Sequence, residues 1–305
     1  MEYDEQEVMQ AVSQGFRTLC EVHEAYVLEP HVVPLGARRE EGKREEMVIV
    51  AKGDITRCYA PLMHPELPNT LAKIRYGDEA ATLAFVHKYG LLGYGKLVPF
   101  TQHPSRGDPL PWFWTHAETV HIYLEVASYL QNEDMDGLDK YLHALRSPSS
   151  WYGDQEYWPS AFIASKERVD HITANKPPTS DVLHDALRMG IEMRPENAPS
   201  LMDYGRWFLR TLVNPNIAGI HPEIAEFEGH DRPCFVFHAL CEMVYWHLAN
   251  PLGKLSIRRC ANPQCQALFF PKTAKQKYCP PLWGQSDSPC ANRHRVNKWR
   301  RAHAG

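Results

Sequence analysis

The feature that most constrains this chain is a cluster of cysteines near its C-terminal end. Of its eight cysteines, four fall within 31 residues, at Cys260, Cys265, Cys279 and Cys290. The other four are scattered through apolar or mixed surroundings, where we expect small buried side chains. In a reducing compartment such a cluster favours metal binding over disulfide formation. Because about fifty residues hardly form a hydrophobic core unaided, a metal would hold this segment together.

The cysteine pattern predicts one structural zinc ion. Asn-Pro between the first two cysteines favours a tight turn that presents two thiolates together. Four thiolates complete a tetrahedron and leave no open position for a reacting molecule. The spacing lacks the ferredoxin-type triplet, which favours zinc over an iron–sulfur cluster. The ten-residue insertion Pro280–Pro289 must loop out, and it leaves the fourth ligand open between Cys290 and a histidine, His294 or His303.

Charge is divided unevenly along the chain. Residues 254–305 contain eleven Lys and Arg residues and one acidic residue, a net charge of +10; since the whole chain carries −4, residues 1–253 carry −14. A basic tail on an acidic body predicts a phosphate-rich partner for the tail. The candidate nucleic-acid contacts are Arg293, Arg295, Lys298, Arg300, Arg301, Lys275 and Lys277.

The segment after Cys290 is predicted to form the basic helix. Val296, Trp299 and His303 then share a narrow stripe, and cations cover much of the remaining surface. We expect Val296 and Trp299 to pack on the zinc module while the basic side faces phosphates. Stacking of Trp299 on a base is the alternative.

These residues resemble the CGNR-type zinc finger. The matching pieces are Cys260 with Cys265, Phe269-Phe270, Lys277-Tyr278-Cys279 and Cys290-Ala-Asn-Arg293. The chain departs from the family in having Ala291 in place of glycine and a longer interval between Cys279 and Cys290. In that family the finger commonly follows a mainly helical domain called ABATE, and its members are regarded as stress-linked transcription regulators. The resemblance covers residues 257–302 and is loose elsewhere; it implies a DNA-binding regulator.

The rest of the chain predicts a mainly α fold with a small β element. We expect a helical body over residues 1–253, with the character of a regulatory or sensor domain, and the zinc module with its basic helix over 254–305. The body's expected elements are helices at 1–28, 79–89, 111–130, 134–145, 181–190, 200–213 and 234–248, a hairpin or two short strands at 47–50 and 55–59, and loops at 30–46 and 147–160.

Several functions are excluded or disfavoured. No apolar stretch is long enough to span a bilayer, and the acidic first residues do not resemble a signal peptide, so we expect a cytoplasmic protein. His116 and His121 lack the spacing of a zinc protease, and the glycine-rich segment 90–96 lacks the Ser or Thr of a phosphate loop. We therefore expect a non-enzymatic protein that binds DNA in preference to RNA. An RNA-binding protein, an adaptor with a purely structural zinc and an enzymatic body remain alternatives, as does an effector or homodimer partner at the body.

Overall fold

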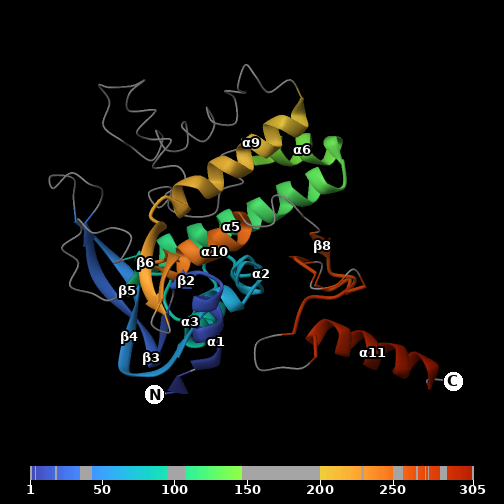
Figure 1. Ribbon diagram of the computed structural model, residues 1–305. Coiled ribbons are helices and arrows are strands. Elements are labelled where there is room, and N and C mark those ends of the chain that lie inside the picture. The colour runs from blue at the N-terminus through green and yellow to red at the C-terminus, as the bar shows by residue number, and fades with distance from the viewer. Residues whose placement is uncertain are drawn as a thin grey trace.

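A computed structural model gives the fold of the chain (Figure 1). The structure describes residues 2–3, 5–17, 19–34, 43–94, 107–145, 200–227, 230–249, 257–265, 267–271, 273, 275–281 and 287–303. The predicted helix at 181–190 and loop at 147–160 lie outside these residues. Among the helices of the described part, none has the length and apolar character needed to cross a membrane.

Helices dominate the body, and four of them follow the sequence prediction closely. They are α3 (Glu79–Tyr89), α5 (Leu110–Gln131), α6 (Met135–Leu145) and α9 (Leu201–Val213). The starts of two are fixed by side-chain caps. Asp78 accepts a hydrogen bond from the N–H of Ala81 at 2.9 Å, and Ser200 accepts one from the N–H of Asp203 at 3.1 Å. Each cap satisfies a backbone donor that the first helical turn leaves without a partner.

Helix α5 is the centre of the body. It packs against α6, α9 and the short α2 (Leu67–Leu71), as Figure 1 shows. Most of its side chains are buried, and the Tyr123 hydroxyl donates to the carbonyl of Leu248 in α10 (Leu240–Ala249) at 2.7 Å. The remaining short helices of the described body are α1 (Glu5–Ser13), η1 (Pro61–Met63) and η4 (Asn214–Ile217).

A long β-hairpin replaces much of the predicted N-terminal helix and loop. Strands β3 (Cys20–Pro34) and β4 (Lys43–Tyr59) pair antiparallel from Cys20↔Tyr59 to Pro34↔Lys43. Beside β4 lie β1 (Glu2–Tyr3), parallel, and β5 (Gly107–Pro109), antiparallel. The predicted helix over 1–28 is therefore wrong beyond α1. The predicted loop over 30–46 is wrong at its described residues, which belong to β3 and β4. The short strands predicted at 47–50 and 55–59 are parts of one strand, β4.

A second sheet corrects the prediction for residues 234–248. Strands β2 (Phe16–Arg17), β7 (His230–Val236) and β6 (His221–Phe227) pair in the order β2-β7-β6, and helix α10 starts only at Leu240. Pro233, just before the predicted helix, lies in β7. Strand β2 pairs only with Phe235 and Val236, so β7 has a single neighbour, β6, at Pro233. A missing N–H is tolerated at such a locally unpaired edge.

The glycine-rich segment after α3 begins at the end of that helix. Gly90 caps α3 with φ 83°, a conformation that favours glycine. The three following N–H groups, of Leu92, Gly93 and Tyr94, converge on the carboxylate of Asp108 at 2.5–3.3 Å. Asp108 is 1% exposed. These donors, which could cradle a phosphate, are thus taken by the chain's own carboxylate.

Candidate metal centre and basic helix

A small hairpin presents the first two cysteines. Strands β8 (Arg258–Arg259) and β9 (Leu268–Phe269) pair antiparallel, and the N–H of Cys260 donates to the carbonyl of Ala267 at 2.9 Å. The N–H of Cys265 donates to the carbonyl of Asn262 at 2.9 Å, which closes the Asn-Pro turn predicted from the sequence. The turn brings both thiols to one side of the hairpin.

The other two cysteines come from a following segment and from a helix. The N–H of Ala261 donates to the carbonyl of Lys277 at 2.9 Å, which holds the segment carrying Cys279 beside the first turn. Cys290 is the second residue of α11 (Pro289–Ala302). Ser288 caps this helix by accepting from the N–H of Ala291 at 3.3 Å. The last ligand candidate is thus fixed at a helix start.

The four sulfur atoms form a group that could hold one metal ion. The sulfurs of Cys260, Cys265, Cys279 and Cys290 all lie within 4.8 Å of one another, and those of Cys265 and Cys279 are 3.5 Å apart. A tetrahedral ion with metal–sulfur bonds of about 2.3 Å would separate its ligands by about 3.8 Å. The donor set therefore fits a thiolate-bound tetrahedral ion. In the part of the chain that the structure describes, it is the one cluster of this kind.

The electrostatics of the cluster favour a bound cation. Burial opposes ionisation of Cys265, but hydrogen bonds from the backbone of Ala267 and from the Cys279 and Cys290 thiols outweigh it and lower the Cys265 pKa. Burial raises the pKa of both Cys279 and Cys290. Several thiolates at one place repel each other unless a cation offsets their charge, and a bound metal ion lowers the pKa of each thiol that coordinates it.

The module is anchored on the C-terminal half of α5. The side-chain amide of Gln131 donates to the carbonyl of Ile257 at 2.9 Å and accepts from the N–H of the same residue. Arg259 forms an ion pair with Glu125 at 3.0 Å. On β9, Leu268 packs into the main core of the body while its neighbour Phe269 packs among the cysteines. Successive side chains of a strand point in opposite directions, so this strand joins the two cores.

Loss of the Gln131 contact should loosen the module without removing its metal. We expect Gln131→Ala to speed amide hydrogen exchange at Ile257 and neighbouring β8, because two hydrogen bonds worth about 1 kcal/mol each are lost. Bound metal should stay at one equivalent. Lys140→Ala, an exposed change on α6, is the matched control. Unchanged exchange at Ile257 would show that Gln131 does not anchor the module.

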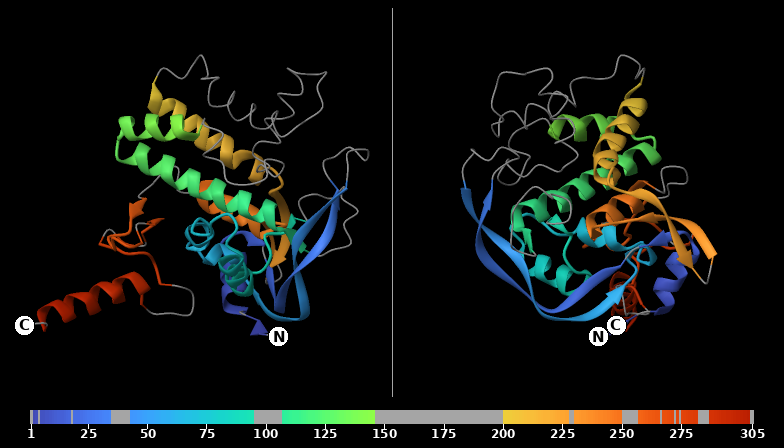
Figure 2. Two further views of the ribbon diagram at one scale, coloured as in Figure 1. Left: turned by 180° about the vertical axis from the view of Figure 1, so that it is seen from behind. Right: turned by 60° about the vertical axis from the view of Figure 1, so that its left-hand side comes forward.

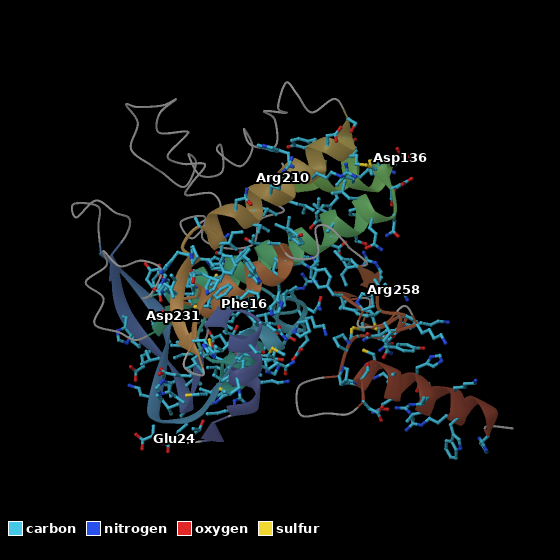
Figure 3. The ribbon with its side chains drawn as sticks, in the orientation of Figure 1. Phe16, Glu24, Asp136, Arg210, Asp231 and Arg258 are labelled. Carbon is cyan, nitrogen blue, oxygen red and sulfur yellow. The ribbon has the colours of Figure 1, made fainter. Side chains whose placement is uncertain are left out.

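Helix α11 carries most of the predicted cations into solvent. Figures 1 and 2 show it running away from the body, and Figure 3 shows its side chains projecting outward. Arg293, Arg295, Lys298 and Arg300 are exposed. Lys275 and Lys277 are also exposed, in the segment before Cys279, while the Arg301 side chain lies outside the described residues. Two of these cations have partners. Arg295 pairs with Asp287 at 3.0 Å and also donates to the side-chain oxygen of Asn292, and Arg293 donates to Gln264 at 3.4 Å.

The prediction that Val296 and Trp299 pack on the zinc module is wrong. Their exposed fractions are 47% and 62%. The cysteine cluster already has its apolar neighbours in Phe269 and the partly buried Tyr278. The start of α11 contacts the module through Cys290, through the hydrogen bond from Arg293 to Gln264, and through the ring of His294, which lies against Tyr278 at 5.4 Å. No feature of the sequence indicated that the Val296 and Trp299 side chains are exposed, because their apolar spacing on the helix suggested burial.

The two alternative histidine ligands have other contacts. His294 packs on Tyr278, and the ring of His303 stacks on Trp299 with centroids 4.7 Å apart. Neither belongs to the group of four converging sulfurs. The structure therefore places Cys290, and neither histidine, in the position of the fourth candidate ligand.

A buried cysteine–histidine contact in the body went unnoticed in the sequence. His116 of α5, fully buried, lies 2.9 Å from the Tyr245 hydroxyl and 3.5 Å from the sulfur of Cys241, both on α10. Burial lowers the His116 pKa to about 3 and raises the Cys241 pKa well above its usual value. A neutral thiol beside a neutral imidazole is a structural contact between helices and not an activated nucleophile. The aromatic side chains of Trp112 and Trp114 are likewise core residues.

Comparison with known proteins gives no relative: neither a family model, nor a curated protein, nor a solved structure matches the chain. The resemblance to CGNR-type fingers and to ABATE therefore stays a prediction from the motif residues alone.

Proposed function

We propose that the chain is a DNA-binding transcription regulator in which one structural zinc ion anchors a basic helix. The observation that carries this proposal is α11 itself. It starts at the cysteine cluster, presents four exposed cations, and has no acidic residue from Pro289 to Ala302. The motif resemblance to CGNR-type fingers supports the same function.

Zinc is the metal that suits this donor set. Four thiolates converging from turns and a helix start match its tetrahedral structural sites, and they leave no position open for catalysis. When bound, zinc would offset half of the thiolates' negative charge and cross-link β8, β9 and α11. The residues that would hold it are Cys260, Cys265, Cys279 and Cys290.

The charge distribution directs a nucleic acid to the module. Residues 254–305 carry a net charge of +10, while the body carries −14 and repels phosphates. The Arg295–Asp287 pair is more than half exposed on both sides, so a phosphate can replace the carboxylate at small cost. An effector or a second copy bound at the body would act on the helix through the Gln131–Ile257 and Glu125–Arg259 contacts.

The test is binding of zinc-loaded protein to duplex DNA and to single-stranded RNA over a salt series. We expect salt-sensitive binding to the duplex, with each phosphate contact contributing about 0.9 to the slope of log affinity against log salt. Replacing Arg293, Arg295, Lys298 and Arg300 by alanine should reduce that slope by about 3 to 4 and weaken binding on the order of 100-fold.

The matched control removes exposed cations of the body, at Lys140, Arg206 and Arg210. This variant should bind like the unaltered protein. Tighter binding to RNA than to the duplex would replace the DNA assignment by an RNA one. Absence of binding to either polymer at low salt would refute the proposal and favour an adaptor whose metal is purely structural.

A further inference from the structure

The exposed apolar stripe on α11 is unexplained by phosphate binding alone. Val296 and Trp299 expose about half or more of their surface on a helix whose other exposed side chains are mostly charged or polar. A helix that served only to attract phosphates would gain nothing from an exposed indole. Trp299 is also ordered against a neighbour, since its ring stacks on His303 at an interplanar angle of 25°.

Helical geometry places four side chains on one line. Asn292, Val296, Trp299 and His303 are separated by four, three and four residues, so they follow one side of the helix over about 16 Å. At about 100° per residue, Arg295 lies about 40° beyond one edge of this line and Arg300 about 40° beyond the other. Both arginines are exposed.

We propose that this recognition stripe, formed by Asn292, Val296, Trp299 and His303, faces the base edges in the major groove of duplex DNA. The inference rests on the proposed function and deepens it by naming the residues that read sequence. Arg295 and Arg300 contact phosphates on the two sides of the groove. The major groove admits one helix, whose central side chains meet bases while its flanks meet the two phosphate rows.

The chemistry of the stripe fits A·T-containing sites. The Asn292 amide can donate to N7 of adenine and at the same time accept from its N6 amino group, a bidentate pairing that distinguishes adenine from the other bases. The Val296 methyl groups offer an apolar contact to the methyl group of thymine. The His303 ring covers one face of the Trp299 indole, so the indole is not free to be sandwiched between two unpaired bases.

Charge complementarity favours DNA over a protein as the occupant. A protein partner that covered Val296 and Trp299 would also cover the arginines on both flanks, and each buried guanidinium would need its own acidic partner. In the groove the same arginines meet phosphates that are already present on both sides.

The experiment separates base reading from phosphate binding. Duplexes selected from a random pool by the full zinc-loaded protein are compared with scrambled duplexes and with the selected duplexes carrying uracil for thymine. The variants are Val296→Ala/Trp299→Ala, Arg295→Ala/Arg300→Ala, and the conservative Trp299→Phe. Because all these side chains are exposed, the variants should keep the melting temperature and one equivalent of zinc.

The stripe variant should lose at least about 10-fold in its preference for selected over scrambled duplexes, while its affinity for scrambled DNA and its salt slope stay unchanged. Uracil substitution should weaken the unaltered protein and not the stripe variant. The arginine variant should lower the salt slope by about 2 and keep the ranking of sequences.

Failure of the inference is distinct from failure of the proposed function. If the unaltered protein binds no DNA, the proposed function falls with the inference. If it binds DNA but the stripe variant ranks duplexes as before, only the recognition stripe is refuted. Conversion of a dimer into a monomer by Val296→Ala/Trp299→Ala, seen by sedimentation, would likewise overturn it and identify the stripe as a contact between two copies.

Discussion

Removal of the metal is expected to unfold the C-terminal module and to leave the helical body folded. Structural zinc contributes about 10–16 kcal/mol to the folding of zinc-finger peptides, far more than any other single interaction in a segment of this size. The module has little to replace it, because its buried cluster consists of Cys260, Phe269 and Cys279. The body keeps its own core around α5 and α10.

Chelation and Cys260→Ser should have the same effect. Cys260 is 4% exposed, so serine would leave a buried hydroxyl and three thiolates in place of a complete tetrahedron. We expect bound metal to fall from one equivalent to a small fraction, and amides of β8, β9 and the start of α11 to exchange rapidly. Amides of α5 should remain protected. DNA affinity should fall at the same time, since α11 loses its anchor at Cys290.

The matched control is Cys234→Ser, which alters a buried cysteine of β7 outside the cluster. It should keep one equivalent of metal. Full metal binding by Cys260→Ser, or unchanged exchange in the module after chelation, would show that the four cysteines do not hold a structural ion.

Local signals predicted α3, α5, α6 and α9 and the convergence of the four cysteines well. Capping residues such as Asp78 and Ser200, together with apolar spacing, mark α3 and α9 within a residue or so of their starts. The Asn-Pro turn between Cys260 and Cys265 is equally local. These features depend on side chains only a few residues apart, which a sequence shows directly.

Long-range pairing explains the errors in the body. The residues from Phe16 to Leu28 have apolar spacing compatible with a helix, but Gly15, at φ 84°, ends α1 and the chain turns into β2 and β3. Strand β3 is defined by its partner β4, and β7 by β6 and β2. A partner strand far along the chain can override local preference, and no window of a few residues contains that information.

The exposed stripe of α11 shows a different limit. Apolar residues at helical spacing predict that one face is covered, but they do not say by what. The assumption that Val296 and Trp299 are covered within the chain was wrong, and their exposure became visible only in three dimensions. The structural role of Asp108 was missed for a related reason. Its carboxylate accepts from three backbone N–H groups 14–16 residues earlier, and no sequence motif indicates such a contact.

Asp108→Ala is expected to be among the most damaging single substitutions in the body. The change would leave the N–H groups of Leu92, Gly93 and Tyr94 without their acceptor in a buried place. At about 1–3 kcal/mol for each buried donor left unsatisfied, three donors should lower the unfolding free energy by about 3–9 kcal/mol. The loop cannot easily move away, because the carbonyl of Leu92 accepts from the N–H of Cys241 in α10 at 3.0 Å.

Urea unfolding followed by circular dichroism measures this effect, with Asp78→Ala as the matched control. Asp78 also accepts a backbone N–H, but it is exposed, so its loss should cost only about 1 kcal/mol. Asp108→Asn keeps the shape but loses the charge and one acceptor oxygen, and it should fall between the two. A loss for Asp108→Ala no larger than that for Asp78→Ala would mean that water or a rearranged loop satisfies the three donors. The carboxylate would then not be what fixes the segment between α3 and α5.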